Sequence, residues 1–297
     1  MPKVNIDPFQ IYGWQGQRLS CGPLKVVLVP AIGGRIISLR FEGKEFLYTQ
    51  KEHAGETFDF SNDQDLAARK KELGFRLWGG DKTWVAPQSE WQEGIPPLEL
   101  DAGNYALTWE EGGVAVMTSP VCRETGLRIV RKVRLDEEMT LHVREELHNT
   151  TSDRTIRKGI WNVTQILRPC TFFVPAVAGA FHSYHHEDKT LPEAKDIFTE
   201  SQDWVEVPCR KQTVFKCGGI PREGQVIVKM PLGGPKDIIW LKTFSFSPPA
   251  EYAHRSAVEI FSSGTANYAE LELHAPVATL EPGASCHFEQ QWRFKKV

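Results

Sequence analysis

A glutamate near the C-terminal end of the chain has the surroundings of a group that could transfer protons. Glu259 lies in the segment SAVEIFSS, residues 256–263. Strand alternation places its side chain on the same face as Ala257 and Phe261. Small and aromatic neighbours would remove part of the carboxylate's water and raise its pKa toward the range useful for proton transfer. We therefore predict Glu259 as a catalytic base, with a glutamate on a solvated strand face as the alternative.

The next segment, YAELELHA at residues 268–275, carries a second set of titratable side chains. In a strand, Glu270, Glu272 and His274 share one face with Tyr268, and the residues between them occupy the other face. Such a polar face could line a cleft, although a solvated outer face is the commoner meaning of this alternation. Glu272 and His274 are therefore candidates for substrate binding.

A loop rich in glycine and aromatic residues is predicted over residues 79–88, GGDKTWVAPQ. In this loop Trp84 could stack on the C–H surface of a sugar, and Lys82 could donate hydrogen bonds to its hydroxyls. The structural alternative is that the tryptophan closes one end of the fold and the lysine lies in solvent. Lys82 and Trp84 are predicted as substrate-binding residues.

A strand predicted over residues 157–167, RKGIWNVTQIL, carries two further candidates. Alternation places Trp161, Val163 and Gln165 on one face. An aromatic ring beside an amide is typical of a surface that faces a sugar, and we predict that Trp161 and Gln165 bind substrate. For Gln165 alone, a buried amide with its hydrogen bonds satisfied is the alternative explanation.

A histidine-rich segment, FHSYHHED at residues 181–188, raises the question of a metal. Its spacing matches no established ligand signature, and a strand would point the adjacent His185 and His186 apart. A polar surface loop is therefore predicted. The sequence also lacks the P-loop, the dinucleotide-binding glycine motif, G-x-S-x-G and H-E-x-x-H. We expect neither a metal nor another cofactor.

Short runs of β-branched and aromatic residues, each ended by Gly, Pro, Asn or Asp, should form the elements that position these side chains. A dozen or more such runs occur, which is too many for one flat sheet, so the sequence predicts an all-β fold, a large antiparallel β-sandwich. One short surface helix is predicted within residues 62–73. No repeat or long linker divides the chain, so residues 1–297 are predicted to form a single domain. The predicted strands cover residues 25–29, 35–41, 105–109, 114–118, 127–135, 139–147, 156–167, 225–230, 237–244, 257–262, 268–275 and 286–294.

Composition limits the partners that the chain could have. The formal net charge is −3, and no stripe of Lys and Arg is present, so nucleic acid is not an expected partner. No run of 18 apolar residues and no signal-peptide pattern is present, which predicts a cytoplasmic protein with no membrane partner. The six cysteines form no C-x-x-C pair and are predicted to be mostly buried thiols.

Three segments together resemble the galactose mutarotase-like, or aldose 1-epimerase-like, superfamily, and more closely a sparsely characterised bacterial branch of it. These are VVLVPAIGGRIISLRFEGKEFLY (26–48), GGDKTWVAP (79–87), and a tail (258–294) in which a Glu-bearing strand precedes a hairpin, the turn LEPG and a final aromatic strand. The resemblance implies the supersandwich form of the antiparallel β-sandwich. It covers the two ends and part of the middle of the chain.

Members of this superfamily that interconvert anomers use a glutamate as base toward the anomeric hydroxyl and a histidine as acid toward the ring oxygen. By order and spacing the resemblance places Glu259 at the glutamate position, and a shifted alignment places Glu270 or Glu272 there. Where those members carry the histidine, this chain has WNVTQ, residues 161–165. Gln165 cannot donate and recover a catalytic proton as histidine can.

The sequence therefore predicts a carbohydrate-binding protein or carbohydrate-active enzyme, with a small sugar or an oligosaccharide as its ligand. If it is an enzyme, an isomerase with epimerase-like or mutarotase-like proton transfer at an anomeric centre is expected. The alternative is a non-catalytic saccharide-binding module on the same scaffold, because fold does not fix function.

Overall fold

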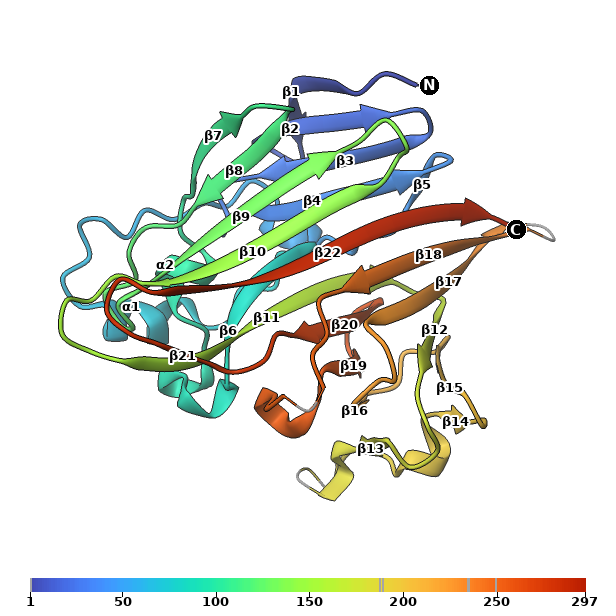
Figure 1. Cartoon of the computed structure of the whole chain (residues 1–297). Helices are drawn as coiled ribbons and strands as arrows, with labels where there is room; N and C mark the ends of the chain where they lie inside the picture. The colour runs from blue at the N-terminus through green and yellow to red at the C-terminus, as the bar shows by residue number, and fades with distance from the viewer. Residues whose placement is uncertain (1, 187, 189, 234–235, 249) are drawn as a thin grey trace.

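Two antiparallel sheets form the body of the molecule (Figure 1). A computed structural model of the chain describes residues 2–186, 188, 190–233, 236–248 and 250–297. In this part of the chain, one sheet has 12 strands and is called sheet I, and the other has 10 strands and is called sheet II. One apolar core lies between them, with Leu28 and Ile36 from sheet I and Val143 and Trp240 from sheet II. The antiparallel sandwich predicted from the sequence is confirmed.

Sheet I holds the N-terminal strands at one end and strands from the second half of the chain at the other. The strand β21 (Ala278–Leu280) pairs with β11, and β5 (Lys44–Glu45) pairs with β4. The spatial order is β1 (Asn5–Ile11), β2 (Trp14–Cys21), β3 (Leu24–Val29), β4 (Arg35–Phe41), β6 (Asp81–Ala86), β11 (Ile156–Leu167), β20 (Tyr268–His274), β19 (Val258–Ser262), β16 (Phe215–Gly219) and β13 (Phe181–Ser183).

Sheet II brings the C-terminal strand into the middle of the sheet. In Figure 1 this strand, drawn in red, lies between the green β10 and the orange β18. The spatial order is β14 (Thr199–Glu200), β15 (Trp204–Cys209), β12 (Cys170–Pro175), β17 (Gln225–Gly233), β18 (Lys236–Phe244), β22 (Ser285–Lys296), β10 (Leu141–Asn149), β9 (Leu127–Leu135), β8 (Val114–Thr118) and β7 (Ala106–Glu110).

Helices are short in this fold. The predicted helix is α1 (Leu66–Leu73), which begins after Asp65 because the Asp65 carboxylate accepts a hydrogen bond from the Ala68 backbone N–H at 2.9 Å. A four-residue helix that the sequence did not predict, α2 (Leu98–Asp101), is buried. No helix in the described ranges is long and apolar enough to cross a membrane. The 3₁₀ turns are η1 (Lys51–His53), η2 (Gln88–Glu90), η3 (Gln92–Gly94), η4 (Tyr184–His186), η5 (Ala194–Asp196) and η6 (Ala253–Arg255).

The segment predicted as a binding loop is in fact a central strand. The prediction for residues 79–88 was wrong, because Asp81–Ala86 forms β6 between β4 and β11, and all six of its residues are buried. The sequence analysis did not predict this strand because several of its residues are charged or polar. They are tolerated there because Asp81 and Thr83 find partners between the two sheets.

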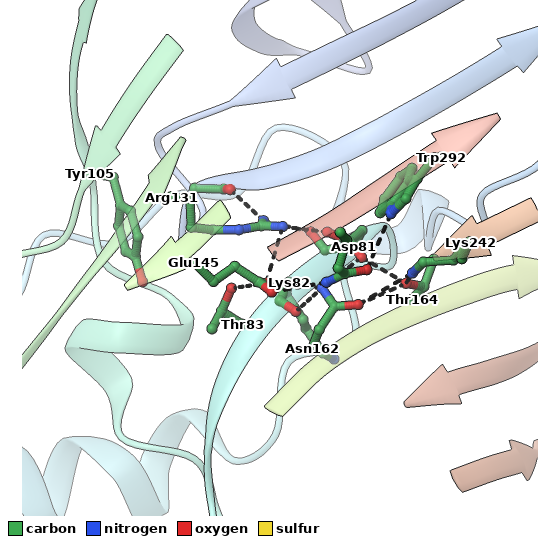
Figure 2. Close-up of polar contacts among 12 residues, drawn as sticks. Asp81, Lys82, Thr83, Tyr105, Arg131, Glu145, Asn162, Thr164, Lys242 and Trp292 are labelled. Atoms are coloured by element: carbon green, nitrogen blue, oxygen red, sulfur yellow. Dashed lines mark hydrogen bonds and ion pairs between the residues drawn. The ribbon is translucent and has the colours of Figure 1, made fainter. Parts of the chain in front are cut away.

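A buried polar network joins the two sheets at this strand (Figure 2). Arg131 on β9 is fully buried and donates to the Asp81 carboxylate, to the Asp81 backbone carbonyl at 3.0 Å and to the Gly34 carbonyl at 2.7 Å. Its guanidinium also lies 3.7 Å from the carboxylate of Glu145 on β10. Burial raises the pKa of Glu145, and the charge of Arg131 opposes that rise.

Two side chains of β11 extend the network across the core (Figure 2). Asn162 donates to Asp81 at 2.9 Å and to Glu145 at 3.0 Å, and the Thr164 hydroxyl donates to Asp81 at 2.6 Å. Lys242 on β18 donates to Thr164 at 2.7 Å and lies over the ring of Trp292, 4.3 Å from its centroid. Burial lowers the pKa of Lys242 to about 8. The sheets are thus held together by directed polar contacts as well as by apolar packing.

Replacing Arg131 with Met should destabilise the fold by about 3–5 kcal/mol, because the Asp81 and Glu145 carboxyl groups would lose their buried cation. The matched control is Lys132→Met on the next residue, whose ammonium pairs at the surface with Glu110 at 2.8 Å. An exposed pair contributes at most about 1 kcal/mol. Urea unfolding of both variants at pH 7 measures the difference. Equal losses in the two variants would contradict a structural role for the network.

Candidate functional site

All seven residues predicted for the site lie on one face of sheet I, the face that points away from sheet II. We call it the site face. Strand alternation explains why the seven residues share this face, because the residues that alternate with them along the strands, such as Asp81, Asn162 and Thr164, point into the network between the sheets. The predicted residues are Lys82 and Trp84 on β6, Trp161 and Gln165 on β11, Glu272 and His274 on β20, and Glu259 on β19.

The strand register places these residues in rows across the sheet. In one row Lys82 pairs with Val163, which pairs with Glu272, which in turn pairs with Glu259. The adjacent row contains Trp84, Trp161 and His274. The row on the other side pairs Gln165 with Glu270. Residues far apart in the sequence are therefore neighbours on one surface.

A lysine that the sequence analysis missed holds the two central carboxyl groups. The ammonium of Lys216 on β16 lies 3.0 Å from Oε2 of Glu259 and 3.0 Å from Oε2 of Glu272. The same oxygen of Glu272 also accepts a hydrogen bond from the indole N–H of Trp161 at 3.0 Å. Burial opposes the charge on Lys216, but the two carboxyl groups outweigh it and raise its pKa.

Glu259 is surrounded by hydrogen-bond partners. Besides Lys216, its Oε2 contacts Nε2 of His274 at 3.1 Å and Nδ1 of His254 at 3.3 Å, and its Oε1 accepts a hydrogen bond from the Tyr184 hydroxyl. Three of these four contacts fall on Oε2, and Oε1 takes the fourth. Glu259 is also fully buried.

The two carboxyl groups have opposite pKa shifts. Burial would raise the pKa of Glu259, but Lys216 and the imidazoles of His274 and His254 outweigh burial and hold this pKa well below its usual value. Burial raises the pKa of Glu272, and burial together with the charges of Glu259 and Glu270 outweighs the lowering effect of Lys216. Glu259 is therefore the member of the pair whose surroundings favour the ionised form, and Glu272 is the member whose surroundings favour the protonated form.

Aromatic rings pack beside the carboxyl pair. Trp161 stacks on His274 with 5.2 Å between ring centroids, and it meets the rings of Trp84 at 5.0 Å and His254 at 5.1 Å. Trp91, from the chain segment after β6, stacks on Trp161 at 5.5 Å. Burial lowers the pKa of His274, which keeps its ring neutral against these aromatics.

The site face is largely covered by the chain. Glu272 is 1% exposed and Trp161 is 2% exposed. The side chains of Lys216 and His254 are 20% and 18% exposed, so the carboxyl pair comes closest to solvent beside them. The solvated face that was the alternative for residues 268–275 is therefore not what the structure shows.

Three of the side chains could be considered as a metal site, because donor atoms of His254, Glu259 and His274 lie within 4.8 Å of one another. Two contacts oppose a metal there. The Gln88 backbone N–H donates to Nε2 of His254 at 3.3 Å, which leaves the ring proton on Nδ1, facing Glu259. The ammonium of Lys216 lies against the same carboxylate oxygen. The three residues fit a hydrogen-bonded network better than a metal centre.

The structure adds four residues to the site that sequence reasoning did not find: Lys216, Tyr184, His254 and Trp91. Tyr184 lies in the histidine-rich segment, which forms β13 and η4 instead of the surface loop predicted; Glu187 of that segment is outside the described residues. A signal for β16 existed in the glycine pair 218–219. A Cβ atom on Gly218 would lie 2.9 Å from Cγ of Glu259, so only glycine fits there.

Comparison with known proteins identifies the fold. No family model and no curated protein sequence matches this chain. Among solved structures, the Slr1438 protein of Synechocystis sp. PCC 6803 is similar, with a TM-score of 0.62, 12% identity and 99% of each chain covered. A galactose mutarotase-like protein from Clostridium acetobutylicum has a TM-score of 0.57 and 11% identity, again over 99% of each chain. A "putative aldose 1-epimerase" from Escherichia coli K12 has a TM-score of 0.58 and 17% identity, over 99% of this chain and 100% of that one.

These similarities extend over the whole chain at low sequence identity, so they establish the fold and leave the chemistry to the residues of the site face. The chain has the galactose mutarotase-like fold, as the resemblance of its two ends and middle segment implied. A fold of this kind hosts a site without fixing its reaction.

Replacing Lys216 with Met should destabilise the protein by roughly 3 kcal/mol at pH 7, because two buried carboxyl groups would lose their shared cation. In the wild type, the lowered pKa of Glu259 gives stability that is present above its unfolded pKa and lost as pH falls through its folded pKa. Without the lysine both carboxyl pKa values rise, so the deficit of the variant should shrink between pH 7 and pH 5.

Urea midpoints at the two pH values, for wild type and variant, measure this change. Lys25→Met is the matched control, because Lys25 is an exposed residue of β3 in the same sheet. A deficit for Lys216→Met that is independent of pH would show that the lysine does not hold the carboxyl pair.

Proposed function

We propose that the chain is a sugar-directed isomerase that exchanges protons with the anomeric centre of a saccharide at the site face. The observation that carries the proposal is the pair Glu259 and Glu272, whose pKa values are driven in opposite directions around one lysine. Environments that separate the pKa values of neighbouring groups assign them different roles in proton transfer. The fold shared with mutarotase-like proteins supports a sugar as the substrate class.

Glu272 is the proton donor in this proposal. Its Oε2 accepts hydrogen bonds from Lys216 and Trp161, so the proton of the neutral carboxyl group belongs on Oε1. A carboxylic acid kept neutral by burial can protonate a sugar ring oxygen near neutral pH. This supplies the acid that the sequence lacks at Gln165, where the resemblance implies a histidine.

His254 is the proton acceptor, and Glu259 orients it. The ring proton on Nδ1 faces the Glu259 carboxylate at 3.3 Å. The lone pair on Nε2 accepts the Gln88 backbone N–H at 3.3 Å, so the sugar hydroxyl must take the place of that N–H. A carboxylate that holds one nitrogen of a histidine while the other takes a proton is a recurrent arrangement in catalysis. Glu259, predicted from sequence as the base itself, is fully buried with four hydrogen-bonding neighbours and acts in this proposal as a positioning residue.

The reaction balances with these two groups. His254 removes the proton of the anomeric hydroxyl while Glu272 protonates the ring oxygen, and the bond between that oxygen and the anomeric carbon breaks to give the open-chain aldehyde. Rotation about the next carbon–carbon bond presents the other face of the aldehyde. Ring closure then returns the proton of the attacking hydroxyl to Glu272 and passes the proton on His254 to the carbonyl oxygen, which gives the other anomer.

Trp84, Trp161, His274, Lys82 and Gln165 stay predicted contacts of the sugar. All five side chains are at most 8% exposed. A sugar ring can therefore reach them only if the covering segments move, and closure over the bound sugar would then exclude water from the proton transfer.

Glu272→Gln and His254→Gln should each slow anomer exchange by roughly 10²- to 10⁴-fold, because each removes one proton-transfer group with little change in shape. Exchange is measured by NMR or polarimetry on α-D-galactose and α-D-glucose. Glu281→Gln and His142→Gln, away from the site face, are the matched controls and should retain the wild-type rate.

The variant Glu259→Gln separates this assignment from the one made from sequence. A positioning role predicts a smaller loss than that of Glu272→Gln. If Glu259→Gln abolishes exchange while His254→Gln leaves it intact, Glu259 is the base and the assignment to His254 is wrong. A wild-type protein that binds sugar without exchanging anomers would favour the non-catalytic alternative.

The rate of exchange should fall as pH rises through the raised pKa of Glu272, because only the protonated carboxyl group can act as the acid. The pH profile of kcat/KM measures this limb, and Glu272→Gln should remove it from any residual activity. An increase in rate across the same range would instead identify Glu272 as the base.

A further inference from the structure

Two free cysteines are direct partners on neighbouring strands of sheet II. Cys170, at the start of β12, pairs with Cys209, at the end of β15, in antiparallel register. Both residues are buried and belong to the apolar core between the sheets. Directly paired residues of antiparallel strands carry their side chains on the same face of the sheet. The two thiols are therefore neighbours inside the core.

The register of the two strands suits a disulfide. Paired residues of antiparallel strands have Cα atoms about 4.5 or 5.5 Å apart, depending on the hydrogen-bond pattern. A disulfide spans Cα atoms about 4.4 to 6.8 Å apart, so both kinds of pair fall within its range. The thiols also interact directly: burial raises the pKa of Cys209 well above its usual value, and a hydrogen bond with Cys170 raises it further. A bond between the sulfurs therefore needs no movement of the strands.

Cations lie close to this pair. Burial lowers the pKa of Arg168, and negative charge on Cys209 or Cys170 would oppose that fall. Burial also lowers the pKa of Lys44 on β5, and negative charges nearby, Cys170 among them, oppose it. Positive charge beside a cysteine favours the thiolate, which is the form that reacts with oxidants. Cys170, close to both cations, is therefore the member of the pair that an oxidant attacks first.

A cavity at the surface reaches the same cysteine. Its volume is about 350 Å³, and its lining includes Cys170 with the adjacent Pro169 and Thr171. Lys229 and Arg210 also line it and add positive charge. A small neutral oxidant such as hydrogen peroxide fits a space of this size, so it can approach the start of β12 from solvent.

We propose that Cys170 and Cys209 are an oxidisable pair, which a peroxide converts into a disulfide between β12 and β15. The Cys170 sulfur first forms a bond to one oxygen of hydrogen peroxide, the O–O bond breaks, and water leaves. The Cys209 sulfur then attacks the Cys170 sulfur, so that the S–S bond forms, the S–O bond breaks and a second water leaves. Two thiols are oxidised, one peroxide is reduced, and both thiol protons leave in water.

The disulfide would close the base of an excursion that the chain makes from sheet II to sheet I and back. Between β12 and β15 the chain carries β13, an edge strand of sheet I, and the turn η4 (Figure 1). The Tyr184 hydroxyl on η4 binds the Glu259 carboxylate, so this excursion is part of the cover of the site face. The pair would oxidise in the same way whether or not the site face exchanges anomers.

The test is oxidation of the full, previously reduced chain with a small excess of hydrogen peroxide at pH 7. Thiols titrated in denaturant should fall from six to four, because two are consumed. A digest of the alkylated protein should contain one linked pair of peptides, with Cys170 joined to Cys209, and dithiothreitol should reverse the change. The oxidised protein should also unfold at a higher urea concentration, since the bond closes a long loop in the unfolded chain.

Cys170→Ala and Cys209→Ala should each form no disulfide at the same peroxide dose. The matched control is Cys122→Ala, which removes an equally buried thiol outside the pair and should still lose two thiols. Six surviving thiols in the wild type, a bond from Cys209 to Cys217 on β16, oxidation that dithiothreitol does not reverse, or a urea midpoint that falls on oxidation would each overturn the proposal. The peptide map of the wild type decides the question even if a variant fails to fold.

Discussion

A guanidinium buried between the two sheets determines the geometry of the site. Arg131 binds the carboxylate of Asp81, and β6 can satisfy that carboxylate only if its odd-numbered residues face sheet II. Strand alternation then points Lys82 and Trp84 to the opposite face. A slip of one residue would expose Asp81 and push the Lys82 ammonium into the apolar core, which is far too costly. The contacts between the sheets therefore fix the register of the strand that carries two of the five side chains predicted to contact the sugar.

Two buried lysines have similar pKa shifts but different surroundings: Lys82 lies on the site face of sheet I, and Lys242 on β18 of sheet II lies between the two sheets. Burial lowers the pKa of both Lys82 and Lys242 to about 8. Lys242 donates to Thr164 and Asn162, so its charge is part of the packing between the sheets. Lys82 has rings around it and no hydrogen bond within the part of the chain that the structure describes. The difference lies in the neighbours, and only the lysine without acceptors is left available for a ligand.

The fold and most residues of the site face could be predicted from the sequence because both depend on side chains that alternate between the two faces of a strand every second residue. The predicted strands at residues 35–41, 127–135 and 156–167 match β4, β9 and β11 to the residue. Sequence reasoning failed at β6, where charges on both faces hid a central strand, because their partners on β9, β10 and β11 come from 50 to 83 residues away. It also missed Lys216 and His254, whose roles depend on pairing with β19 and on a turn that no local pattern marks.

The turn η6, which carries His254, links the site to the chain segment that covers it. His254 and Arg255 both have φ near 59°, a left-handed conformation that costs about 1 kcal/mol or more for each residue other than glycine. The strain persists because it directs the His254 imidazole to Glu259, and the Tyr184 hydroxyl on the neighbouring turn binds the same carboxylate. The turns η6 and η4 are therefore both held in place by the buried carboxylate of Glu259. A ligand that draws the imidazole away from Glu259 would weaken the contact that offsets the strain, so the histidine proposed as the proton acceptor would also govern the opening of the face.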